Sequence, residues 1–277
     1  MYSNPFDVMA RHALPLLLLI SGITVSGMML HDRSSMNSIG GSIDTLTYVY
    51  EDYTLRSKNI VGSGESADTS YFTASYPVFG DNRVNRFVAS VLWGDEATTA
   101  EAAARSFIDD FDAFFREDQQ PRAWTSELTA KVTELTPSYL GLSIDAYTFS
   151  GGAHGYYYTR FAHFDRTENR ELTLDDVIPT RFRKEATAVG ERYFREQEQL
   201  KVDEPLEGNY FFEDGLFHLP DNFALERDSM LFLYNIYEIK PYVYGQTLVR
   251  IPYPDIERLL SDRAKRIISE INTQNRF

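Results

Sequence analysis

The sequence of 277 residues carries 27 Lys and Arg against 41 Asp and Glu, a formal net charge of −14, and it contains no cysteine. The negative charge repels a phosphate backbone, which excludes nucleic acid as a partner and favours a cationic one. The lack of cysteine excludes disulfides, thiolate zinc sites, iron–sulfur clusters and thiol nucleophiles. With 43% hydrophobic residues, the chain has enough apolar side chains to fold around a core.

A hydrophobic segment lies near the N-terminus. Residues 13–30 are 18 consecutive uncharged residues, and the first half is rich in leucine. This length suits either the core of a signal peptide or a short membrane span. Ser21 and Gly22 begin a less hydrophobic second half, which favours a signal peptide that is cleaved near Met28.

This segment predicts export. We expect residues 1–30 to be a signal peptide or membrane anchor and residues 31–44, rich in Ser, Gly and Asn, to be a linker. The rest of the chain is then extracytoplasmic, either periplasmic or anchored to the cytoplasmic membrane. Contact with the membrane is expected only through residues 13–30.

The first half of the remaining chain shows strand patterns and then a helix pattern. Apolar and polar side chains alternate, as in half-buried strands, in residues 46–50, 71–78 and 84–92. Thr98 and Glu101 then have the spacing of a capping box. After them, apolar side chains recur at helical spacing on one face: Phe107, Ile108, Phe111, Phe114 and Phe115.

The second half continues with strands, turns and shorter helices. Further strands are predicted at residues 129–135, 139–149, 156–164, 230–237 and 246–251. Helices are predicted after Leu172, with Pro179 near the first turn, and from Pro254 onward. Because strands and helices are segregated, we predict an α+β fold. It consists of two fused units of mainly antiparallel sheet with packed helices, residues 45–165 and 166–277.

The histidines and acidic residues do not form a recognisable catalytic or metal-binding motif. His154 is the most interesting, because it lies in a glycine-bounded turn that exposes it. His163 and Asp165 share one face of a strand, whereas His154 and His163 are an odd number of residues apart. No nucleophile elbow, H-E-x-x-H, P-loop or dinucleotide-binding motif is present. We therefore predict no catalytic residue, no metal site and no cofactor, and favour a protein that is not an enzyme.

A tyrosine-rich turn is the best candidate for a binding surface. Rigid amphipathic side chains around a Pro and a Gly suit ligand contact, although they can equally be hydroxyl-bonded corners of the core. The predicted ligand-binding residues are His154, Tyr234, Tyr237, Tyr242 and Tyr244. The residues expected to shape the two turns are Gly151, Gly152, Gly155, Pro241 and Gly245.

Several short motifs resemble a known domain family. They are Tyr76-Pro77-Val78 with Asn85, Gly151-Gly152-Ala153-His154-Gly155, Phe164-Asp165, Leu172-Thr173-Leu174-Asp175-Asp176, Leu219-Pro220-Asp221-Asn222-Phe223, Tyr234-Asn235, Tyr237-Glu238-Ile239 and Ile251-Pro252-Tyr253. Together they resemble the extracytoplasmic domain shared by RsiV-type anti-sigma factors, which bind lysozyme, and the N-terminal part of PdaC-type peptidoglycan deacetylases. The resemblance covers about residues 45–262 and implies two fused α+β units.

The resemblance also implies a compartment and a class of ligand. It implies recognition of lysozyme or of cell-wall material, and an envelope location. About 12 residues precede the hydrophobic segment, so we expect no cytoplasmic anti-sigma portion, and no deacetylase catalytic domain is expected after the matching region. The leading hypothesis is a non-catalytic cell-envelope binding or sensing module, whose partner is a cationic protein such as lysozyme, or peptidoglycan. The alternative is a cell-wall glycan hydrolase or esterase with an unrecognised site.

Overall fold

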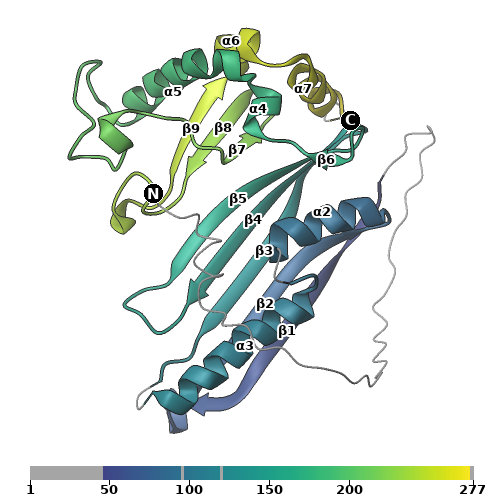
Figure 1. Ribbon diagram of the computed structural model, residues 1–277, viewed down its shortest axis with the longest axis vertical. Helices are drawn as coiled ribbons and strands as arrows, with labels where there is room; N and C mark the ends of the chain where they lie inside the picture. The colour runs from purple at the N-terminus through teal and green to yellow at the C-terminus, as the bar shows by residue number, and fades with distance from the viewer. Residues whose placement is uncertain (1–45, 95–96, 119–120, 275–277) are drawn as a thin grey trace. The chain divides into compact units, whose positions relative to one another are not determined.

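The computed structural model describes residues 46–94, 97–118 and 121–274. These residues form a six-stranded and a three-stranded sheet, each with helices packed on it (Figure 1). The predicted α+β fold is therefore confirmed. The predicted signal peptide or anchor (1–30) and linker (31–44) lie outside the described residues.

The larger sheet has the order β1-β2-β3-β4-β5-β6. Its strands are β1 (Tyr48–Val61), β2 (Asp68–Phe79), β3 (Thr125–Leu135), β4 (Tyr139–Phe149), β5 (Tyr156–Asp165) and β6 (Arg170–Glu171). Neighbouring strands are antiparallel, except that β2 and β3 are parallel. Parallel neighbours need a crossover connection, and here two helices supply it.

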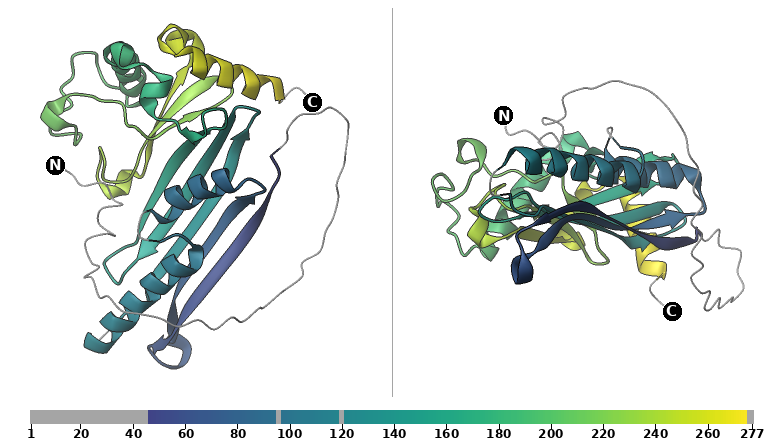
Figure 2. Two further views of the ribbon diagram at one scale, coloured as in Figure 1. Left: turned by 45° about the vertical axis from the view of Figure 1, so that its right-hand side comes forward. Right: turned by 90° about the horizontal axis from the view of Figure 1, so that it is seen from below.

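The crossover helices α2 (Asn82–Trp93) and α3 (Ala100–Glu117) lie on one face of the larger sheet (Figure 2). The predicted helix after Thr98 is confirmed as α3, and its Phe111 is fully buried. The capping residue is Thr99 rather than Thr98, because the Thr99 side chain accepts a hydrogen bond of 3.1 Å from the Ala102 N–H.

The strand predicted at residues 84–92 is wrong, because this segment is helix α2. The Asp81 side chain caps the helix by accepting from the Arg83 N–H at 2.8 Å. Val84, Val88 and Val91 are then buried on one helical face. Short apolar runs fit either element, and here the cap decides in favour of the helix.

The smaller sheet has the order β7-β8-β9 and is antiparallel. Its strands and the helices of this part are β7 (Phe223–Leu225), β8 (Ser229–Tyr234), β9 (Thr247–Pro252), α4 (Leu174–Val177), α5 (Arg183–Gln197), α6 (Tyr253–Ile256) and α7 (Asp262–Gln274). Every residue of β8 is buried. This sheet and its helices share one core with Tyr139 of β4.

The predicted continuous helix from Pro254 is wrong in one respect, because it is broken into α6 and α7. Leu260 has an extended backbone, with φ −78° and ψ 146°. Ser261 then begins a new helix, since its hydroxyl accepts from the Ala264 N–H at 3.1 Å. Pro254 does lie in the first turn of α6, as predicted.

Residues 45–277 form one compact unit. The predicted division of this unit at residue 165 stays a prediction. Among the helices of residues 46–274, leaving out the undescribed gaps, none combines the length and the apolar character needed to cross a membrane.

Candidate functional site

The β4–β5 hairpin presents His154 at the surface. Gly151 has a φ of 86°, a value that side chains disfavour. Gly155 is required for a different reason: a Cβ on it would lie 2.3 Å from the ring of Tyr147. Only glycine therefore lets the backbone at position 155 pack against Tyr147. His154, the residue before it, is exposed.

The second turn connects β8 to β9 and presents several tyrosines. Tyr237 has a φ of 66°, a left-handed conformation that is uncommon for a side chain of this size. Residues Tyr242–Tyr244 then form a short 3-10 helix. Gly245 ends it with a φ of 66° and leads the chain into β9.

The structure brings these two turns together. The ring of His154 stacks on that of Tyr242, with centroids 4.1 Å apart and planes inclined by 25°. His154 Nε2 lies 3.2 Å from the hydroxyl of Tyr237. Tyr157 of β5 contacts Tyr242 edge-on at 6.1 Å. We call His154, Tyr157, Tyr237 and Tyr242 the aromatic cluster.

The hydrogen bonds of His154 fix its tautomer. Nδ1 lies 3.1 Å from the carbonyl oxygen of Gly155, which can only accept, so Nδ1 carries the proton. Nε2 then accepts from the Tyr237 hydroxyl, and both ring nitrogens have partners. In this arrangement the imidazole orients Tyr237. Within the described residues, no group of three or more His, Asp or Glu side chains converges as a metal site.

The other two predicted ligand-binding tyrosines lie elsewhere. Tyr234 is buried, its hydroxyl donates to the carbonyl oxygen of His218, and burial raises its pKa. Tyr244 is 66% exposed at the tip of the turn. Of the five predicted residues, the structure therefore joins His154, Tyr237 and Tyr242. It adds Tyr157, which the sequence did not single out.

Two asparagines at strand ends of the smaller sheet bond to β5: Asn222 precedes β7, and Asn235 follows β8 and begins the tyrosine turn. Asn222 accepts from the Phe161 N–H and donates to the Thr159 carbonyl, both at 2.8 Å. Asn235 accepts from the Thr159 N–H at 2.8 Å. Their amides thus substitute for a neighbouring strand along this edge of β5. Both belong to motifs of the resemblance, but nothing in their sequence context reveals this role.

A buried histidine joins the two sheets beneath these contacts. His163 Nε2 donates to the carbonyl oxygen of Phe223 at 2.7 Å, so Nδ1 accepts from the Tyr139 hydroxyl, also at 2.7 Å. Its ring stacks on Phe223 with centroids 4.2 Å apart. Burial lowers the pKa of His163 to about 4, which keeps it neutral. His163 therefore has a structural role.

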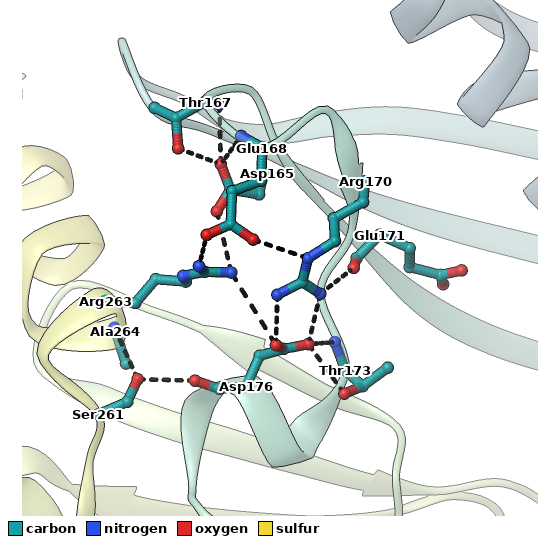
Figure 3. A network of polar contacts seen from close by, with 10 residues as sticks. All are labelled: Asp165, Thr167, Glu168, Arg170, Glu171, Thr173, Asp176, Ser261, Arg263 and Ala264. Atoms are coloured by element: carbon teal, nitrogen blue, oxygen red, sulfur yellow. Dashed lines mark hydrogen bonds and ion pairs between the residues drawn. The ribbon is translucent and has the colours of Figure 1, made fainter.

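A network of ion pairs also lies at the junction of the larger sheet with α4 and α7 (Figure 3). Asp165 is buried, and its Oδ2 lies 3.2 Å from Nη1 of Arg263. Its Oδ1 accepts from the N–H groups of Thr167 and Glu168 at 2.7 and 2.9 Å. His163 and Asp165 share a strand face, as predicted, and both are used for packing the fold.

Asp176 extends this network to the start of α4. Its carboxylate accepts two hydrogen bonds from Arg170, at 2.5 and 2.9 Å, which lower its pKa to about 2. The same carboxylate accepts from the N–H and hydroxyl of Thr173, which completes a capping box. Asp175 and Asp176 therefore begin a helix, as their position in the sequence indicates.

A hollow of about 450 Å³ lies beside the same hairpin. Its lining residues are Phe114, Asp118, Arg122, Ser150, Gly151, Gly152 and Ala153. Within this lining, the Arg122 guanidinium donates to the carbonyl oxygen of Gly152 at 3.2 Å. The glycine-rich hairpin thus contributes to both the hollow and the aromatic cluster.

Two crystal structures resemble this one. A DUF3298 family member from Bacteroides fragilis has a TM-score of 0.66 and 22% identity, over 83% of this chain and 99% of the other. A DUF3298 family protein from Pseudomonas aeruginosa has a TM-score of 0.61 and 23% identity, over 80% of this chain and 97% of the other. At these identities the likeness shows the fold alone.

Two family models match successive parts of the sequence. Residues 64–157 match the family described as deacetylase PdaC. Residues 169–254 match a protein family of unknown function, DUF3298. No curated protein matches the chain significantly. The chain therefore carries a PdaC domain followed by a DUF3298 domain, which confirms the family that the sequence motifs indicate.

Proposed function

We propose that this chain is a non-catalytic binding module of the bacterial cell envelope, and that it takes a sugar ring of the cell-wall glycan on the aromatic cluster. The PdaC and DUF3298 domains belong to an uncharacterised family associated with the cell envelope. The PdaC domain supports an extracytoplasmic location and a cell-wall ligand.

The observation that carries this proposal is the stacking of His154 on Tyr242, which joins two turns that are distant in sequence. Tyr237 is 47% exposed and is held in place by its bond to His154. Aromatic faces are electron-rich, so they attract the apolar C–H face of a sugar ring. The Tyr237 hydroxyl donates to His154 and can still accept a hydrogen bond from a hydroxyl of the sugar.

Turns held on rigid strands are well suited to binding. Asn235, at the start of the tyrosine turn, accepts from the Thr159 N–H of β5, and Gly155 lets the hairpin pack against Tyr147. Little conformational freedom is then lost when a ligand stacks on the cluster.

The hydrolase alternative requires a base or a nucleophile in the same place. A general base must lie within hydrogen-bond reach of the proton that it abstracts, and the hydroxyl that His154 Nε2 reaches in this structure is that of Tyr237, a phenol, at 3.2 Å. A glycosidase needs a pair of carboxylates about 5–9 Å apart across the sugar. The members of the aromatic cluster are three tyrosines and a histidine, so the cluster supplies no such pair.

Incubation of the protein with insoluble peptidoglycan tests the proposal. We expect the protein to sediment with peptidoglycan while no soluble sugar or acetate is released above a blank. Release of product that is lost in His154→Ala would establish the hydrolase or esterase instead. Failure to sediment would contradict the glycan ligand.

The net charge of −14 supports a second candidate, a cationic partner protein such as lysozyme. Surface plasmon resonance with lysozyme and with cytochrome c, a basic protein of unrelated shape, separates specific from general attraction. Specific recognition requires lysozyme to be retained longer than cytochrome c at equal salt. If lysozyme and cytochrome c are retained equally long, the binding is a general attraction between opposite net charges and lysozyme is not specifically recognised.

A further inference from the structure

The two edges of the larger sheet differ. At one edge, β6 and the side chains of Asn222 and Asn235 occupy the backbone groups of β5. At the other edge lies β1, which pairs only with β2 among the described strands. An open edge presents a row of N–H and C=O groups that another strand can use.

The regular part of this edge is short and well defined. Residues 48–56 pair with β2 in unbroken register, from Tyr48 opposite Phe79 to Arg56 opposite Tyr71. The register shifts after Arg56. Beyond this point the Asp112 carboxylate on α3 accepts from Ser57 and Asn59, which turns the strand toward the helix.

Asp52 and Arg56 stand on the same face of this segment, because they are four residues apart. Both are exposed, and among the described residues neither has an ion-pair partner. The guanidinium of Arg56 lies over the ring of Tyr71, 5.0 Å from its centroid, which keeps it on the sheet surface. Thr54 lies midway between the two charges.

This pattern is complementary to itself. If two copies of β1 pair antiparallel about a two-fold axis at Thr54, Asp52 of each copy lies opposite Arg56 of the other. Residues opposite one another in an antiparallel pair have Cβ atoms about 4.5–5.5 Å apart, close enough for the charges to interact. On the other face, Tyr53 lies opposite Leu55, and both are half-buried at the margin of the core beneath α3.

We propose that β1 is a homodimer interface, in which residues 52–56 of two copies pair antiparallel about Thr54. A second copy of the chain is the partner that fits this edge. In a two-fold symmetric pair every contact occurs twice, so Asp52 of each copy meets Arg56 of the other. The net charge of −14 on each copy opposes association at long range, and the contact is short. The dimer is therefore weak and depends on concentration.

Charge exchange tests the register. In Asp52→Arg, two arginines face two arginines, and in Arg56→Asp, two aspartates face two aspartates. Sedimentation velocity at about 0.15 M salt, where the Debye length is about 8 Å, screens the overall repulsion but not charges in contact. We expect the wild type to dimerise as concentration rises, each single variant to remain monomeric, and an equimolar mixture of the two to form a heterodimer. The double variant Asp52→Arg/Arg56→Asp restores the homodimer.

Matched controls change the same charges elsewhere. Asp203→Arg and Arg181→Asp alter exposed side chains in the part of the chain that packs on the smaller sheet, and both variants are expected to dimerise like the wild type. A wild type that stays monomeric at its highest soluble concentration overturns the proposal. So do single variants that dimerise like the wild type, and a mixture of the two that fails to associate.

Discussion

Replacement of Asp165 by alanine is expected to lower the free energy of unfolding by about 3–5 kcal/mol, the usual result of breaking a buried charged pair. The variant removes the buried carboxylate that lies 3.2 Å from Arg263, itself only 23% exposed, and leaves this arginine with Glu168 and, at 3.9 Å, Asp176. It also removes the acceptor for the N–H groups of Thr167 and Glu168. Urea unfolding followed by circular dichroism measures the loss.

An exposed pair provides the matched control for this loss. Glu101 and Arg105 form an i,i+4 pair on α3 with exposed fractions of 56% and 67%, so Glu101→Ala is expected to cost less than about 1 kcal/mol. A loss for Asp165→Ala that is no larger than that for Glu101→Ala would show that the network in Figure 3 is solvated and does not hold α7 to the sheet.

His163 is expected to make the protein less stable in mild acid. Its pKa is about 4 in the folded protein against an ordinary value of 6.5. Between these values the unfolded state binds a proton that the folded state excludes, so stability falls as pH falls. The free energy of unfolding changes by about 1.4 kcal/mol per pH unit in this range. We therefore expect the contribution that neutral His163 makes above pH 6.5 to fall by about 3 kcal/mol when the pH reaches 4.

His163→Gln isolates this effect. The glutamine amide can still donate to the Phe223 carbonyl and accept from the Tyr139 hydroxyl, but it does not titrate. The difference in free energy of unfolding between wild type and variant should therefore shrink from pH 7 to pH 4. A constant difference for His163→Gln would contradict the buried neutral imidazole.

The sequence predicts most of the fold because most elements bury a recognisable face. The phenylalanines of α3 repeat at helical spacing, and α3 buries Phe111 against the sheet. In β1, only the first few residues were predicted. In its later part the only large apolar side chains before Ile60 are Tyr53 and Leu55, which are half-buried, and charged or polar residues surround them because the strand lies at an exposed edge. The segment of α2 was predicted as a strand, because its apolar run fits either period.

The candidate site could be predicted only in pieces. Glycines around His154 indicate an exposed turn, and the residues around Pro241 indicate a second one. Their meeting depends on contacts between residues far apart in sequence, such as Asn222 with Phe161 and Asn235 with Thr159. Side-chain amides that substitute for a strand leave no local pattern. The sequence therefore could not separate Tyr237, which is exposed, from Tyr234, which is buried.

The binding of peptidoglycan by two variants of the aromatic cluster tests the central claim most directly. Tyr242→Ala removes the ring on which His154 stacks. Tyr237→Gly removes the exposed ring beside it and relieves the left-handed backbone at φ 66°, so its fold should be retained. Tyr50→Ala is the control, because Tyr50 has the same 47% exposure as Tyr237 but lies on β1.

Co-sedimentation with insoluble peptidoglycan over a series of protein concentrations gives the dissociation constants. Both cluster variants should bind at least roughly 30-fold more weakly than the wild type, the loss of about 2 kcal/mol that marks a binding hot spot. Tyr50→Ala should bind like the wild type. Folded Tyr242→Ala and Tyr237→Gly proteins that bind with unchanged affinity would contradict the assignment of the aromatic cluster as the glycan site.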